Sequence, residues 1–129
     1  MHAKHLYEYA VVRLVPKVER EEFMNVGVVL YCAEQRFLQV LFCIDEHRIS
    51  AFAPKLNIAD IEATLNSLKR ICEGAKDAGP IGAYALPERF RWLTATRSTV
   101  VQTSGVHPGL CYDANEKLQS LYAQLVLCP

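Results

Sequence analysis

The chain has no surplus of charge of either sign, because 14 Lys and Arg side chains balance 14 Asp and Glu side chains. Proteins that grip a nucleic-acid backbone usually carry a basic excess, so the balance argues against nucleic acid as the partner without excluding it. Long apolar runs are missing too, and none approaches the roughly 18 residues that a membrane-spanning helix requires. No signal-peptide core follows Met1. We therefore expect no association with a membrane.

Closely spaced cysteine pairs are also missing: the chain has 5 cysteines and no Cys-x-x-Cys. Zinc sites and disulfide frameworks usually show such pairs. Cys32 and Cys43 lie within apolar runs and are expected to be small core residues. Free buried thiols indicate a reducing compartment, so we expect a cytoplasmic protein. Because close ligand pairs are missing, we expect no metal, and we expect no cofactor. Walker, Gly-x-Gly-x-x-Gly and Gly-x-Ser-x-Gly motifs are absent, which leaves enzymatic activity an open question.

The N-terminal third contains two apolar, β-branched runs that flank a charged insert at residues 17–22. Residues 6–15 are apolar on both alternating faces, which predicts a central strand covered on both sides. Strands are also predicted at 26–32 and 36–44, joined by a short hairpin loop and therefore antiparallel. Gly27 indicates a bulge or a close backbone approach.

The remainder of the chain alternates helical and strand patterns. Asp45 can cap a short helix, and Asn57 opens a longer one with an apolar stripe from Ile58 to Ala75. A loop is predicted at 77–88, strands at 90–95 and 99–104, and a Gly/Pro loop at 105–112; residues 89–93 fit a short helix equally well. Asp113 and Glu116 form a capping box that opens a final helix.

Together these patterns predict one α+β domain over residues 1–129. Its mostly antiparallel, five-stranded sheet packs with two main helices in the order β-β-β-α-α-β-β-α.

Two blocks of sequence resemble a known bacterial family. Residues 9–16, 18–23 and 25–28 form the first block, and residues 97–104 with 106–113 form the second. Together they resemble the family catalogued as domain of unknown function 3037. The chain departs from the family pattern at Thr96, where the family has proline, and at residues 105–108, where Gly-Val-His-Pro replaces Pro-Val-His-Thr. Both departures change the stiffness of a loop.

The resemblance implies no assigned activity. It does imply a genomic setting, since members of the family are encoded beside HipA-type kinase-like proteins. That setting implies an accessory protein with a protein partner, in a toxin–antitoxin-like context.

The sharpest charge asymmetry lies in residues 89–112, which contain Arg89, Arg91 and Arg97 and no acid. Arginine forks with hydroxyls and loop amides are typical of a phosphate or oxyanion site. The other interpretation is that these arginines decorate a half-exposed hairpin and pair with the glutamates of residues 17–22.

The acidic insert has two interpretations as well. Its glutamates could supply a general base or a divalent-metal site. Charges of alternating sign more often indicate a solvated, self-paired loop.

Two polar residues outside these segments also have open roles. His107 with Cys111 and Asp113 fits a nucleophilic triad, although a polar loop histidine is the more ordinary interpretation. Asn25 could reach a site or bond the backbone at the start of the second strand. Metal binding by His2 and His5 is weaker still.

We expect the charged insert and the arginine-rich segment to lie at the same end of the sheet and to form a candidate anion or partner site. Its members are Arg13, Glu19, Arg20, Glu22, Asn25, Arg97, Ser98, Thr99, Gln102, Thr103, Ser104 and His107. A protein partner is the first expectation. A phosphate-bearing ligand is the alternative, and a homodimer is the third.

Overall fold

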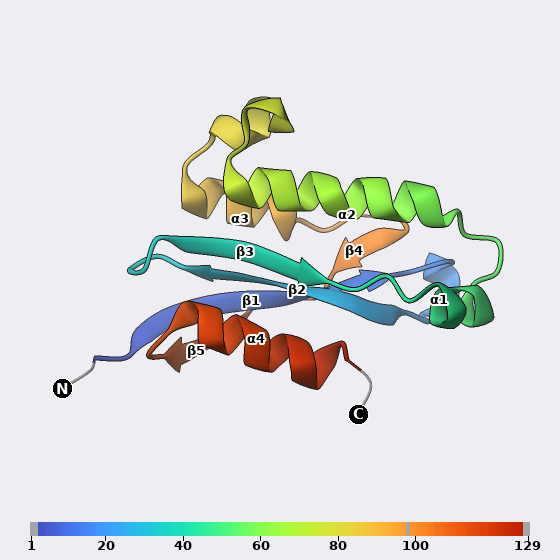
Figure 1. The fold of residues 1–129 in the computed structure, drawn as a ribbon, viewed down its shortest axis with the longest axis horizontal. Helices are drawn as coiled ribbons and strands as arrows, with labels where there is room; N and C mark the ends of the chain where they lie inside the picture. The colour runs from blue at the N-terminus through green and yellow to red at the C-terminus, as the bar shows by residue number, and fades with distance from the viewer. Residues whose placement is uncertain (1–2, 98, 128–129) are drawn as a thin grey trace.

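A five-stranded antiparallel sheet forms the centre of the molecule in the computed structural model, which describes residues 3–97 and 99–127 (Figure 1). The strands are β1 (His5–Leu14), β2 (Met24–Cys32), β3 (Phe37–Phe42), β4 (Val101–Thr103) and β5 (His107–Cys111). Their order is β3-β2-β1-β4, and β5 pairs with β1 on the same side as β4. β1 therefore lies inside the sheet, as its two-sided apolar pattern predicts.

The two short strands divide one edge of β1 between them. β4 pairs with the C-terminal end of β1, with Leu14 opposite Val101. β5 pairs with the N-terminal half, with Tyr7 opposite Gly109. β3 forms the opposite edge of the sheet and pairs with β2 without interruption.

Gly27 fulfils both of its predicted roles. The register of β1 and β2 shifts beside it, since Val12 lies opposite Gly27 but Arg13 lies opposite Asn25. A Cβ at Gly27 would meet the carbonyl oxygen of Leu41 at 2.6 Å. Glycine therefore lets β3 approach β2 closely beside the bulge.

The helices begin where the sequence places their caps. They are α1 (Glu46–Phe52), α2 (Ile58–Glu73), α3 (Leu86–Leu93) and α4 (Ala114–Leu125). The side chains of Asp45, Asn57 and Asp113 accept hydrogen bonds from backbone N–H groups in the first turns of α1, α2 and α4, respectively. Gly74 ends α2 at φ 65°. Short 3₁₀ turns lie at Val18–Arg20, Lys76–Ala78 and Pro80–Ala83.

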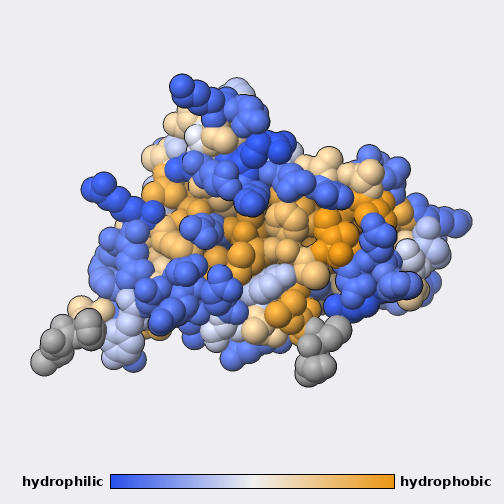
Figure 2. All heavy atoms as spheres, viewed as in Figure 1, coloured by the Kyte–Doolittle hydropathy of each residue, from blue (hydrophilic) through white to orange (hydrophobic). Residues whose placement is uncertain are grey.

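Helices cover both faces of the sheet. α2 and α3 pack over β3 on one face, and α4 packs over β2 and β3 on the other (Figure 1). Side chains alternate along the strands between two hydrophobic clusters, so that Ala10, Val12 and Leu14 face α2, while Tyr7 and Val28 face α4. Figure 2 shows apolar residues in a band between the two helical layers.

The predicted α+β class, antiparallel sheet and single layer of strands are confirmed. The strand predicted at 90–95 is wrong, because residues 90–93 belong to α3 and residues 94–95 follow its end. Pro87 stands in the first turn of that helix, and Phe90 and Leu93 are buried along one side of it. The alternative of a helix at 89–93 is therefore confirmed.

The loop predicted at 105–112 is also wrong, since residues 107–111 form β5. Because of Pro108 the sequence predicts a loop here, although proline is tolerated at the edge of a sheet. Gly109 is required by packing, because a Cβ there would overlap the ring of Tyr7 on β1. In the part of the chain that the structure describes, no helix is long and apolar enough to cross a membrane.

Candidate functional site

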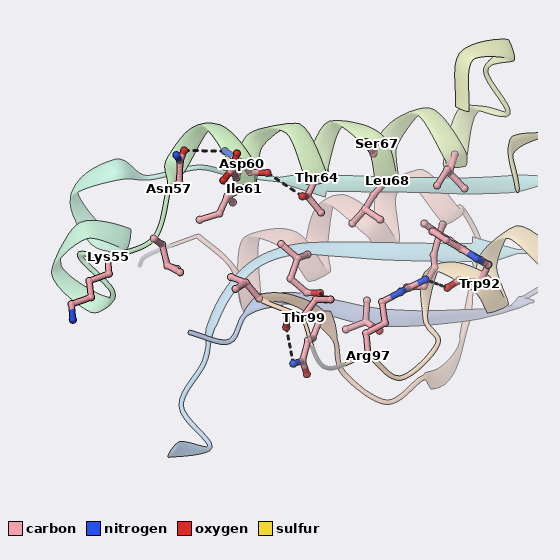
Figure 3. Close-up of a pocket in the computed structure, with 17 residues that line it drawn as sticks. Lys55, Asn57, Asp60, Ile61, Thr64, Ser67, Leu68, Trp92, Arg97 and Thr99 are labelled. Carbon is pink, nitrogen blue, oxygen red and sulfur yellow. Dashed lines mark hydrogen bonds between the residues drawn. The ribbon is translucent and has the colours of Figure 1, made fainter. Parts of the chain in front are cut away.

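A groove of about 610 Å³ lies between α2, the end of α3 and residues 99–103. We call it the α2 groove. Its wall and floor are mainly apolar and include Ile61, Leu68, Leu93 and Val101. Figure 3 shows side chains of α2 along one wall, with Trp92 and Arg97 at one end and Lys55 at the other.

The groove exists because α2 does not cover the whole sheet. α2 and α3 pack over β3, at one edge, and make few contacts with the strands at the opposite edge. β4 has only three residues, Val101–Thr103, all of them half-buried. Residues 99–103 are therefore bordered by α2 but not covered by it, whereas Val12 and Leu14 of β1 are buried.

Arg97 is held at the end of the groove by the last turn of α3. Its guanidinium donates to the carbonyl oxygens of Leu93 at 3.0 Å and Trp92 at 2.5 Å. It also lies 4.4 Å from the centre of the Trp92 ring, a cation–π distance. Burial lowers the pKa of Arg97. Among the described residues no carboxylate forms an ion pair with it, so a fixed positive charge stands beside an apolar surface.

The predicted pairing of the arginines with the acidic insert is not what the structure shows. Arg89 donates instead to the carbonyl oxygens of Ile71 and Cys72 at the end of α2, each at 2.9 Å, and to that of Tyr84. It satisfies carbonyls that the end of a helix leaves unpaired. Arg89 is therefore a structural residue.

The acidic insert does leave the sheet at the same end as the arginine-rich segment. The N–H of Val15 donates to the carbonyl oxygen of Val100 at 2.6 Å, so the segments that lead to the two loops are neighbours. The side chains of Arg20 and Glu22 form an ion pair with each other, and this contact lowers the pKa of Glu22. The insert thus behaves as a self-paired loop.

A second, smaller hollow of about 390 Å³ lies between the acidic insert and residues 52–56. Lys17, Arg20 and Glu22 line it. The two hollows share Lys55 and Leu56, so they are consecutive around the start of α2. Glu19 is exposed and lines neither.

The predicted site residues fall into separate groups. Arg97, Thr99, Gln102 and Thr103 line the α2 groove. Ser98 lies outside the described residues.

Arg13 on β1 lies opposite Asn25 on β2, on the face of the sheet that α4 covers. The guanidinium of Arg13 lies 4.2 Å from the centre of the Phe23 ring. Asn25 Nδ2 donates to the carbonyl oxygen of Leu125 at 3.1 Å and so joins β2 to the end of α4.

Ser104 and His107 contact β1 and stabilise the sheet. Ser104 Oγ accepts from the N–H of Val11 at 2.9 Å. The ring of His107 packs 5.2 Å from that of Tyr9. Neither residue lines the α2 groove.

The geometry does not assemble a nucleophilic triad from His107, Cys111 and Asp113. His107 and Cys111 are the two ends of β5, roughly 13 Å apart at strand spacing. Burial is the main cause that raises the pKa of Cys111, which weakens it as a nucleophile. Asp113 caps α4. In residues 3–97 and 99–127, no three His, Cys, Asp or Glu side chains are grouped as metal ligands.

Sequence reasoning missed the wall that α2 contributes. Asn57, Asp60, Thr64 and Ser67 follow one another at three- and four-residue steps and line the groove beside the apolar stripe. Small polar residues at helical spacing were a visible signal. Only the position of α2 over β3, which the sequence does not specify, turns that row towards a groove.

The model of one family matches the chain over residues 9–126, and its description reads protein of unknown function (DUF3037). The match covers nearly the whole chain, so the chain belongs to this family. Comparison with curated proteins and with solved structures gave no match.

Proposed function

We propose that this member of the DUF3037 family is a non-catalytic accessory protein that binds a short segment of a partner protein in the α2 groove. The observation that carries the proposal is the pairing of an open apolar groove of about 610 Å³ with the fixed cation of Arg97 at its end. Apolar walls supply affinity, and a few placed polar groups supply orientation.

The chemistry of the groove describes its occupant. Ile61, Leu68 and Val101 suit apolar side chains. Arg97 suits a carboxylate, because its guanidinium is partly buried away from water and forms no ion pair with an acid among the described residues. Asp60 lines the same groove and disfavours a highly charged anion. We therefore expect a segment with two or three apolar residues and one acidic residue.

The thiols support a binding role over thiol catalysis. Burial raises the pKa of Cys72 to about 12, and it raises that of Cys111 as well. Only the thiolate is nucleophilic, so both groups are inert near neutral pH. The family resemblance adds a first partner to test, a HipA-type kinase-like protein of the kind encoded beside members of the family.

The test compares two variants of α2 that differ by one position. Thr64→Arg fills the groove, because Thr64 lines it. Ala63→Arg adds the same side chain at an exposed neighbour that does not line it. Tagged wild-type protein and both variants are each co-expressed with a HipA-type kinase-like protein from the same genome, and the amount of co-purified partner is measured.

We expect wild type and Ala63→Arg to retain the partner and Thr64→Arg to lose it by about tenfold or more, the effect of roughly 1.4 kcal/mol of binding free energy. Thermal unfolding of each variant checks that the fold is intact. Equal retention by Thr64→Arg and Ala63→Arg would contradict the proposal, as would the absence of any complex with the wild-type protein.

One observation favours a second candidate, a phosphate-bearing small molecule. Thr103 lines the groove together with Arg97, and a hydroxyl beside a guanidinium is a combination that recognises phosphate. The single tryptophan of the chain, Trp92, stands at this end and reports on it by fluorescence. Saturable quenching by a nucleotide, weakened by Arg97→Ala, would favour this candidate; unchanged emission would remove it.

A further inference from the structure

The two edges of the sheet differ in how they are protected. β4 and β5 share one edge as short pieces, and β5 carries Pro108, which cannot donate to an added strand. β3 forms the other edge with six residues, Phe-Leu-Gln-Val-Leu-Phe, with no charge, no proline and no bulge against β2. Natural sheets usually protect an edge of this kind.

The register fixes which backbone groups of β3 face outward. The N–H of Cys43 donates to the carbonyl oxygen of Val26 at 2.8 Å, next to the pair Gly27 and Phe42. In an antiparallel pair, hydrogen-bonded residues alternate with residues that point away. Leu38, Val40 and Phe42 therefore direct their N–H and C=O groups away from β2, while their side chains stay in the core layer under α2.

This row of outward groups is complementary to its own copy. An antiparallel strand related by a two-fold axis at Val40 places Leu38 opposite Phe42 of the partner subunit. Each of the three outward residues then exchanges two backbone hydrogen bonds. No charge on the strand opposes this approach, because Phe37–Phe42 has none.

The charges at the two ends of β3 favour the same arrangement. Arg36 precedes the strand, and Asp45 and Glu46 follow it; all three are exposed. The two-fold axis at Val40 brings Arg36 opposite Ile44 of the partner subunit, within reach of the acidic pair that follows. Each end of the added strand thus meets the opposite charge.

We infer that the β3 edge joins a second copy of this chain, which extends the sheet across a symmetric dimer. The apolar band between the two helical layers lies on the side that carries β3 (Figures 1 and 2). This surface is distinct from the α2 groove, whose lining contains no residue of β3. The dimer therefore leaves the groove free on each subunit.

Sedimentation velocity of the full chain over a wide range of concentration tests the dimer. Gln39→Lys adds a charge to the exposed face of the edge without entering the core, since Gln39 is exposed. We expect it to raise the dissociation constant of the dimer about tenfold or more. The matched control is Leu110→Lys on β5, where Leu110 is 59% exposed, and it leaves the dissociation constant unchanged.

A charge swap identifies the two-fold arrangement. Arg36→Glu and Glu46→Arg each weaken the dimer, and the double variant restores it, which a loss of folding in one subunit would not do. Hydrogen exchange supplies a second readout, since the amides of Leu38, Val40 and Phe42 become protected with rising concentration.

Three results would each overturn the inference. They are a monomer at every concentration, a dimer that Gln39→Lys leaves intact, and a dimer that Leu110→Lys dissolves. None of them bears on the α2 groove, so the binding proposal stands or falls separately.

Discussion

The two faces of the sheet are covered differently, although both are built from the same alternating strands. On the α4 face, Tyr7, Val28 and Leu118 close a core that the start of α4 seals, since the side chain of Gln35 bonds the N–H of Ala114. On the α2 face, the helix packs over β3 and leaves a groove beside residues 99–103, while Val12 and Leu14 of β1 are buried. A helix at the edge of a sheet stabilises the fold and leaves a groove beside it, whereas a helix sealed over the sheet only stabilises the fold.

Truncating one leucine on each face should lower the free energy of unfolding more in the α4 layer than beside the groove. Leu118 is 0% exposed in the α4 layer, and Leu93 is 2% exposed but borders the groove. We expect Leu118→Ala to lower the free energy of unfolding by about 3–5 kcal/mol and Leu93→Ala by about 2–3 kcal/mol, because the open site can relax or admit water. Urea denaturation measures both; the reverse order would contradict the comparison.

A substitution at Gly109 tests how tightly the α4 face is packed. A Cβ there would overlap the ring of Tyr7, so Gly109→Ala should lower the free energy of unfolding by about 1–3 kcal/mol. Gly105→Ala is the matched control, since nothing lies within 4 Å of its added Cβ. We expect the control to unfold as the wild type does or slightly later in a thermal scan. Equal losses in both variants would show that overlap with Tyr7 is not the cause.

The buried thiols of both faces should make the protein less stable at alkaline pH. Burial raises the pKa of Cys72, on the α2 face, to about 12 from an ordinary value of 9.0. Above pH 9 the unfolded thiol loses its proton while the folded one keeps it, so the unfolded state binds fewer protons and stability falls as pH rises. Between pH 9 and 12 this thiol should remove up to about 1.4 kcal/mol per pH unit.

Cys72→Ala should flatten part of that alkaline decline when unfolding free energy is measured against pH. Cys111→Ala, on the α4 face, serves as the comparison, because burial raises the pKa of Cys111 in the same direction. If the slope of Cys72→Ala equals that of the wild type, ionisation of Cys72 does not contribute.

The smallest effect is expected outside both layers, in the acidic insert. Arg20 and Glu22 pair at the surface, where solvent screens the interaction and side-chain entropy opposes it. Glu22→Gln should therefore leave the melting temperature unchanged in a thermal scan. A clear destabilisation would mean that the insert supports the fold, contrary to its exposure.

The sequence was sufficient for elements that local chemistry specifies. Asp45, Asn57 and Asp113 cap the helices they predict, and the paired apolar faces of β1 identify a strand covered on both sides. β5 was missed because Pro108 and Gly109 are read as a turn by composition, while their strand conformation depends on pairing with β1 and on the Tyr7 ring. α3 was ambiguous because eight residues carry little periodicity.

The candidate site was predictable only in part. An acid-free segment led to Arg97, Thr99 and Thr103, which do line the groove. Arg13 and Asn25 belong to the first block of the family resemblance and lie on the α4 face, where they support packing. Side chains alternate between the two faces of the sheet along a strand, and this alternation decides which face a residue takes. The bulge beside Gly27 shifts the pairing of β1 with β2, so it also changes which residues lie opposite each other.

Site-specific photo-crosslinking on α2 tests the central claim most directly. A photoreactive residue at Thr64 faces the groove, and the same residue at Ala63 does not line it. With the proposed partner, a HipA-type kinase-like protein, co-expressed, we expect a crosslink to it from position 64, lost when Arg97→Ala removes the cation, and none from position 63. Equal crosslinking from both positions, or none from position 64, would contradict the account.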